Sequence, residues 1–105
     1  MKRAHILTER EINRVFAHIA QRPFAQRNRA MFQLSIYAGM RVGEIAALMW
    51  GDVFTPEAKV REQIQLTAEQ TKGSRARTVL LNAQVQRELT AYGRGIGAVS
   101  YTHLR

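Results

Sequence analysis

Apolar residues recur at helical spacing near the start of the chain. Those between Ile12 and Ile19 fall on one face of a helix, and polar residues fall on the other face. Thr8 and Glu11 have the spacing of a capping box, in which each side chain accepts a hydrogen bond from the other residue's backbone N–H. The pattern predicts an amphipathic helix that begins after Thr8 and ends before Pro23.

A second apolar pattern predicts a helix from about Phe24 to Ala38. Its apolar residues cover much of the circumference, so we expect its later turns to form the centre of the core. Gly39 is the expected carboxyl cap, because glycine adopts the left-handed conformation without strain. A third amphipathic helix is predicted to begin at Arg41 or just before it. Its expected inner face consists of Val42, Ile45, Ala46 and Met49.

The periodicity changes in the second half of the chain. Apolar and polar residues alternate from Lys59 to Leu66, which is typical of a β-strand. Residues 71–74 have the composition of a turn, and the pattern from Arg75 to Leu81 predicts a returning strand. We therefore expect the two strands to form a hairpin. Asn82 is the expected cap of a last helix. The predicted inner face of that helix consists of Val85, Leu89 and Tyr92.

These elements predict an α+β fold that is mainly helical, with about four helices and a small antiparallel sheet. A chain of 105 residues has room for one domain with one small core. We expect the domain to cover residues 1–92. Three glycines between Gly93 and Gly97 predict that residues 93–105 form a flexible tail, and whether its sequence is related to that of the domain is left open.

The charge distribution suggests a nucleic-acid partner. The net charge is +8, and thirteen of the sixteen basic residues are arginines, whose planar guanidinium matches pairs of phosphate oxygens. Five arginines and no acidic residue lie between Ile12 and Gly43, and a second basic stretch without acids runs from Gln70 to Arg87. This segregation predicts a surface for a DNA backbone, although solvated surface arginines would give the same pattern. The candidate DNA-binding residues are Arg27, Arg29, Arg75 and Arg77.

Arg41 stands at the junction between two predicted helices. A cation is disfavoured at a helix start, where the macrodipole is positive, so we expect a compensating group outside the helix. A bound phosphate would be held by the guanidinium together with the free amides of the helix terminus. The alternative is a structural ion pair with Glu44 at i, i+3, which would contribute about 0.2–0.5 kcal/mol.

Other classes of site receive little support from the sequence. The chain has no cysteine, which excludes disulfides and thiolate metal sites, and His5, His18 and His103 are too scattered to suggest a metal cluster. No apolar run is long enough to span a bilayer, and the amino end lacks the apolar core of a signal peptide. We therefore expect a cytoplasmic protein.

The junction itself carries a specific motif. Residues 39–45 read Gly-Met-Arg-Val-Gly-Glu-Ile, and Leu48, Trp50, Asp52 and Val53 follow. This resembles the first catalytic box of the tyrosine recombinases, or phage integrase family, which has the form G-x-R-x-G-E-[ILV] followed by L-x-W-x-D-[IV]. Residues 71–81 resemble the family's β-hairpin, although Leu80 replaces the commoner proline. The resemblance covers about residues 6–92.

The resemblance implies a chemistry and a role for three residues. The family cuts one DNA strand by attack of a tyrosine on the scissile phosphate and forms a 3′-phosphotyrosyl link, without a metal or nucleotide cofactor. By position, Arg41 would clamp the phosphate and its transition state. Glu44 would order the active site, and Lys72 would be the general acid for the leaving 5′-oxygen.

Two family features are not found in this sequence. The second box, H-x-x-R, and the nucleophilic tyrosine are expected well after the hairpin, but His103 and Arg105 have a different spacing and Tyr101 precedes them. The sequence therefore predicts the amino-terminal part of a truncated recombinase catalytic domain, which binds DNA phosphates and does not cleave alone.

Two alternatives remain open at this point. One is a non-catalytic DNA-binding module of helix-turn-helix type, in which the helix after Gly39 reads the DNA sequence. The other is a fragment that self-associates through apolar surface normally covered by the rest of the domain.

Overall fold

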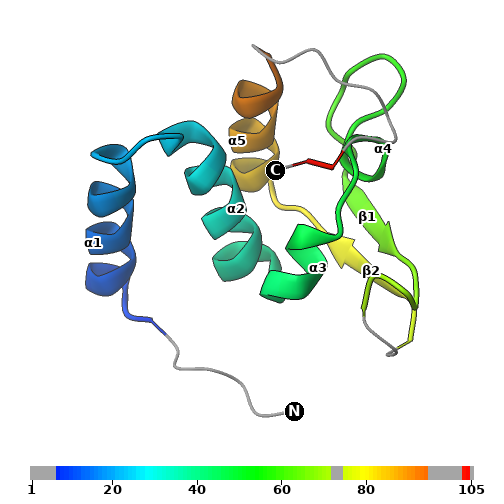
Figure 1. Cartoon of the computed structure of the whole chain (residues 1–105), viewed down its shortest axis with the longest axis horizontal. Helices are drawn as coiled ribbons and strands as arrows, with labels where there is room; N and C mark the ends of the chain where they lie inside the picture. The colour runs from blue at the N-terminus through cyan, green and yellow to red at the C-terminus, as the bar shows by residue number, and fades with distance from the viewer. Residues whose placement is uncertain (1–6, 72–74, 95–102, 105) are drawn as a thin grey trace.

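The computed structural model describes residues 7–71, 75–94 and 103–104. Within these ranges the elements are α1 (Glu9–Ala20), α2 (Ala25–Ala38), α3 (Val42–Ala46), α4 (Trp50–Val53), β1 (Gln63–Leu66), β2 (Arg77–Leu80) and α5 (Ala83–Arg94). The α+β class is confirmed, with five helices rather than about four in the part of the chain described, and one two-stranded sheet (Figure 1). No helix among the described residues is long and apolar enough to cross a membrane.

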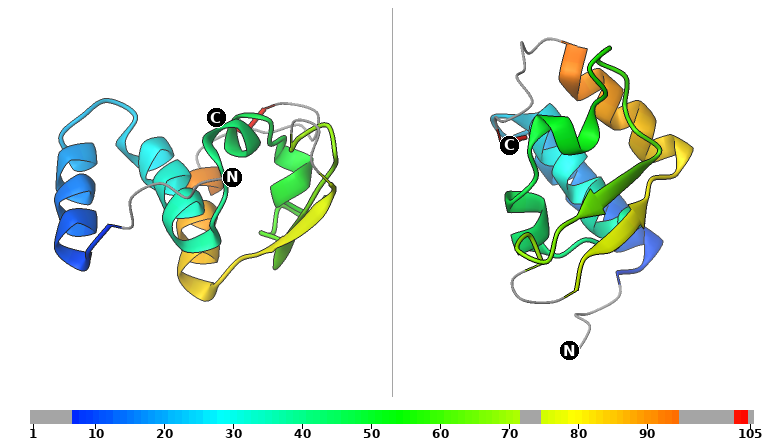
Figure 2. Two further views of the ribbon diagram at one scale, coloured as in Figure 1. Left: turned by 90° about the horizontal axis from the view of Figure 1, so that it is seen from below. Right: turned by 90° about the vertical axis from the view of Figure 1, so that its right-hand side faces the viewer.

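The central element is α2, as its apolar circumference predicts. It packs against α5, α1 and α3, and its residues Ala30 and Leu34 are completely buried. Figure 2 shows α1 at one edge of the molecule, with α2 between it and the other elements. Tyr37, in the last turn of α2, is 38% exposed.

The capping box predicted for α1 is present. The Thr8 N–H donates to Glu11 Oε1 at 2.8 Å, and the Glu11 N–H donates to Thr8 Oγ1 at 3.2 Å. The apolar face of α1 packs on α2, where Phe16 and Phe32 meet edge to face with their ring centroids 5.2 Å apart. None of the α1 residues is fully buried, so α1 adds to the core only from one side.

The prediction for the third helix is wrong in the length of the helix and in part of its inner face. The chain forms two short helices, because the Met49 N–H donates to Asp52 Oδ2 at 2.9 Å and starts α4 there. This break lets Leu48 and Trp50 both enter the core. Ile45 is buried as predicted, whereas Val42 is 81% exposed.

The hairpin forms with shorter strands than predicted. β1 and β2 pair antiparallel, with Ile64 opposite Val79, and both side chains are buried. Val60 lies outside β1 in an isolated bridge with Phe54. Leu80 is 71% exposed at the end of β2, and the turn residues 72–74 lie outside the described residues.

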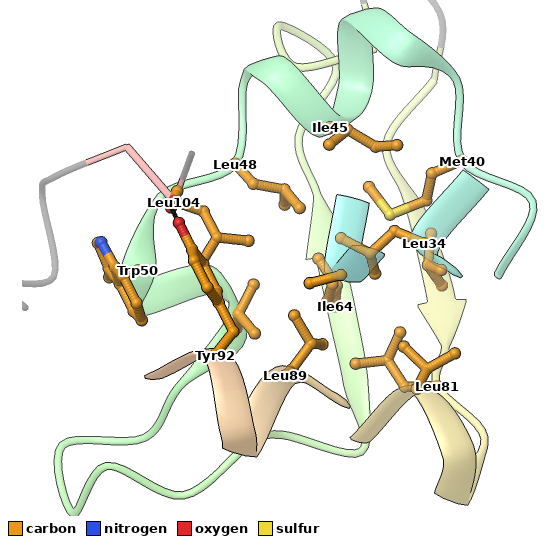
Figure 3. Close-up of a cluster of buried hydrophobic side chains, with 14 of the residues drawn as sticks. Leu34, Met40, Ile45, Leu48, Trp50, Ile64, Leu81, Leu89, Tyr92 and Leu104 are labelled. Carbon is orange, nitrogen blue, oxygen red and sulfur yellow. Dashed lines mark hydrogen bonds between the residues drawn. The ribbon is translucent and has the colours of Figure 1, made fainter. Parts of the chain in front are cut away.

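The core gathers residues from α2, the α3–α4 region, the hairpin and α5 (Figure 3). Val85, Leu89 and Tyr92 form the inner face of α5 as predicted, and Asn82 Oδ1 accepts a hydrogen bond from the Val85 N–H at 2.8 Å. Trp50 is 5% exposed and stacks on Tyr92 with ring centroids 5.6 Å apart, so it packs in the core.

The carboxyl-terminal residues differ from the expected flexible tail where they are described. α5 continues to Arg94, and Leu104 is buried with 1% of its surface exposed. The Leu104 N–H donates to the Leu48 oxygen at 2.9 Å, and the Leu104 oxygen accepts from the Tyr92 hydroxyl at 2.7 Å (Figure 3). His103 forms a β-bridge with Met49. Residues 95–102 and 105, the rest of the predicted tail, lie outside the described residues.

Candidate nucleic-acid interface

The junction between α2 and α3 buries some side chains and exposes others. Gly39 ends α2 in the left-handed conformation, with φ of 72°, as the sequence predicts. Met40 follows with 3% of its surface exposed, and with Ile45 it points into the core on either side of the junction (Figure 3). Arg41, between them, has an extended backbone and is exposed. The buried neighbours therefore fix the position from which the Arg41 side chain extends into solvent.

Glu44 is a buried carboxylate held by three donors. Its Oε1 atom accepts hydrogen bonds from the Arg41 N–H at 3.0 Å and from Arg77 Nη2 at 2.6 Å. Its Oε2 atom accepts from Arg77 Nε at 3.3 Å. Only 5% of the Glu44 side chain is exposed, against 41% for Arg77. The pair therefore joins β2 to the start of α3 through a bidentate contact that is mostly shielded from solvent.

The environment keeps Glu44 ionised. Burial alone raises its pKa, but the hydrogen bond from Arg77, the hydrogen bond from the Arg41 backbone and the charges of both arginines outweigh burial. The net result is a pKa below the ordinary value of 4.5. Glu44 therefore carries a full negative charge at neutral pH, and Arg77 compensates for it.

The guanidinium of Arg41 is available for a ligand. Among residues 7–71, 75–94 and 103–104, no hydrogen bond or ion pair involves this group, and its side chain is exposed. The structural ion pair considered from the sequence is not formed, because Arg77 rather than Arg41 binds the Glu44 carboxylate. Within the part of the chain that the structure describes, no carboxylate therefore forms an ion pair with Arg41.

The four arginines expected to bind DNA have different environments. Arg27 donates two hydrogen bonds of 3.2 Å to the side chain of Asn28, and its guanidinium lies 4.5 Å from the centroid of the Phe24 ring. Arg29 is half-exposed, with Nε 3.8 Å from a Glu88 carboxylate oxygen. Arg27 and Arg29 therefore contact different side chains.

The hairpin supplies the other expected site residues. Arg75 is exposed just before β2, whereas the guanidinium of Arg77 is engaged by Glu44. Lys72, the expected general acid, lies outside the described residues. The pairing of Arg77 with Glu44 was not foreseen, since the two residues are 33 positions apart and no local pattern links them.

A groove of about 410 Å³ lies next to the junction, between α2 and α3. Its lining residues are Arg27, Asn28, Met31, Phe32, Ser35, Val42, Ile45 and Ala46. The lining is mostly apolar and has one charged side chain. The described residues also contain no group of three His, Cys, Asp or Glu side chains placed to hold a metal ion.

The family assignment agrees with this geometry. The model of the phage integrase family matches residues 5–96, a range that includes the Arg41 junction, the hairpin and all five helices. The chain belongs to the phage integrase family. Comparisons with curated proteins and with solved structures found no match. The resemblance of the Arg41 motif to the recombinase box is thus confirmed at the level of the family.

Proposed function

We propose that this chain is the part of a tyrosine recombinase catalytic domain that binds a DNA backbone phosphate through Arg41. The observation that supports this most directly is the unengaged guanidinium of Arg41, exposed at a junction where Met40 and Ile45 are buried. Family membership supports DNA as the ligand, and the net charge of +8 favours a polyanion.

Gly43 gives independent support for a close approach of the ligand. Its φ is not positive, and a Cβ atom added there would meet nothing within 4 Å. Neither backbone conformation nor packing within the described residues therefore calls for glycine at this position. Glycine is also used where a ligand must come close to the backbone, and Gly43 is two residues from Arg41.

In the complete enzyme, Arg41 would stabilise the negative charge that develops on the phosphate, and Glu44 would hold the backbone of Arg41 in place. Lys72 remains the predicted general acid. Burial raises the pKa of Tyr92, and its hydroxyl donates to the Leu104 oxygen, so this tyrosine is poorly suited to act as a nucleophile. We propose that the chain alone binds DNA and does not cleave it.

The length of α3 favours phosphate contact over base reading. The helix-turn-helix alternative requires a helix that lies in the major groove. α3 has five residues, which corresponds to about 7.5 Å at the usual rise of an α-helix. Its exposed Val42 also offers no hydrogen bond to a base edge.

Binding to duplex DNA of two unrelated sequences, measured by fluorescence anisotropy at several salt concentrations, tests this function. Wild type should bind both duplexes equally and lose affinity steeply with salt. Arg41→Ala should lower the slope of log K against log salt by about 0.9, as expected for one lost phosphate contact. Its thermal unfolding should change little, because the hydrogen bond to Glu44 comes from the backbone of Arg41 and is kept in the variant.

Arg14→Ala is the matched control. Arg14 is exposed on α1 and its replacement removes the same charge. If both variants bind equally well, or if binding does not depend on salt, the proposed function is wrong. Light scattering at the same protein concentrations tests the predicted self-association.

A further inference from the structure

Arg77 contacts the chain on both sides of Arg41. Its guanidinium binds both oxygens of Glu44, three residues after Arg41, and its Nη2 lies 3.5 Å from the Gly39 oxygen, two residues before it. A single side chain from β2 therefore spans the junction from which Arg41 extends. The Arg77 side chain remains 41% exposed while making these contacts.

The charges at the junction indicate that Arg77 affects whether the Arg41 guanidinium pairs with Glu44. Glu44 lies at i+3 from Arg41, a spacing at which the two side chains can meet on one face of a helix. With Arg77 in place, both carboxylate oxygens are occupied and the three charges sum to one positive charge. Without Arg77, the carboxylate would be the nearest anion available to the Arg41 guanidinium, and the remaining two charges would cancel.

We propose that Arg77 is a positioning residue that occupies the Glu44 carboxylate and so keeps the Arg41 guanidinium free for a DNA phosphate. This inference rests on the proposed function of Arg41. It changes the role expected for Arg77 from the sequence, which was direct contact with DNA. The two roles differ in one respect: a positioning role depends on the negative charge of Glu44, and direct contact does not.

The test compares DNA affinity of Arg77→Ala, Glu44→Gln and the double variant with wild type and the Arg14→Ala control. Arg77→Ala and Arg14→Ala each lower the net charge by one, whereas the double variant keeps the net charge of +8. The glutamine side chain that Glu44→Gln introduces still has an oxygen to accept the Arg41 N–H, but it cannot neutralise the Arg41 guanidinium.

The expected result is a specific rescue. Arg77→Ala should bind DNA about tenfold more weakly than Arg14→Ala, because the charged hydrogen bond from Arg41 to phosphate is lost to Glu44. The double variant should regain the affinity of wild type. An affinity of the double variant as low as that of Arg77→Ala would overturn the inference and indicate direct contact of Arg77 with DNA.

Folding is monitored in parallel, because Arg77→Ala leaves a buried carboxylate without its partner, which is strongly destabilising. If Arg77→Ala unfolds but the double variant folds and binds like wild type, the proposal stands, since removal of the carboxylate makes Arg77 dispensable. A double variant that also unfolds would overturn it. If Arg41→Ala instead binds DNA as tightly as wild type, the proposed function of Arg41 is wrong. The experiment therefore distinguishes a failure of that function from a failure of the positioning role of Arg77.

Discussion

Replacement of Leu104 with alanine tests whether the carboxyl-terminal residues are part of the core. The Leu104 side chain is 1% exposed, and its backbone is hydrogen-bonded to Leu48 and Tyr92. The substitution removes three carbon atoms, which at about 0.8 kcal/mol each accounts for about 2.4 kcal/mol of lost burial. The cavity left behind adds to this cost, so the free energy of unfolding should fall by about 2.5–5 kcal/mol.

Urea denaturation followed by tryptophan fluorescence measures this change. Trp50 is the only tryptophan in the sequence, is 5% exposed and stacks on Tyr92, so its emission reports on the same part of the core. Leu80→Ala is the matched control: the same atoms are removed from a side chain that is 71% exposed, and the change should stay within about 0.5 kcal/mol. Equal effects of the two substitutions would refute the packed position of Leu104.

Two further predictions concern the junction. Gly43→Ala should raise the free energy of unfolding by about 0.5–1 kcal/mol, because alanine is favoured over glycine within a helix. The same substitution should weaken DNA binding. Undiminished affinity in the anisotropy assay would exclude a close approach of DNA at Gly43. Because the pKa of Glu44 is lower in the folded protein, its stabilising contribution should be complete above the ordinary value of 4.5 and decline as the pH falls through the lowered pKa. Urea denaturation from pH 7 to pH 3 should therefore show wild type losing its advantage over Glu44→Gln in acid, and a constant difference would contradict the assignment.

Features determined by neighbouring residues were predictable from the sequence. The Thr8 cap of α1 and the left-handed Gly39 that ends α2 each depend on a few adjacent positions. The same holds for the inner face of α5, where one periodic pattern places Val85 and Leu89 in the core. The hairpin was predictable for this reason too, although its strands are shorter than the alternation suggested.

Features determined by distant residues were not predictable in this way. The break between α3 and α4 places both Leu48 and Trp50 in the core, a gain that depends on the packing of other elements. Leu104 is not part of a periodic apolar pattern, so no pattern in the sequence predicts its burial. For the candidate site, the sequence predicted roles for Arg41 and Glu44 but did not predict that Arg77 is the partner of Glu44.

The contact between Glu44 and Arg77 also has a consequence for the order of events during synthesis. α3 has five residues, far fewer than the roughly 12–15 that an isolated helix needs for even marginal stability in water. Its start is held by a residue that the ribosome adds 33 positions later. We therefore expect a nascent chain to acquire the proposed phosphate site only after β2 has emerged and docked, so that DNA affinity would report completed tertiary folding.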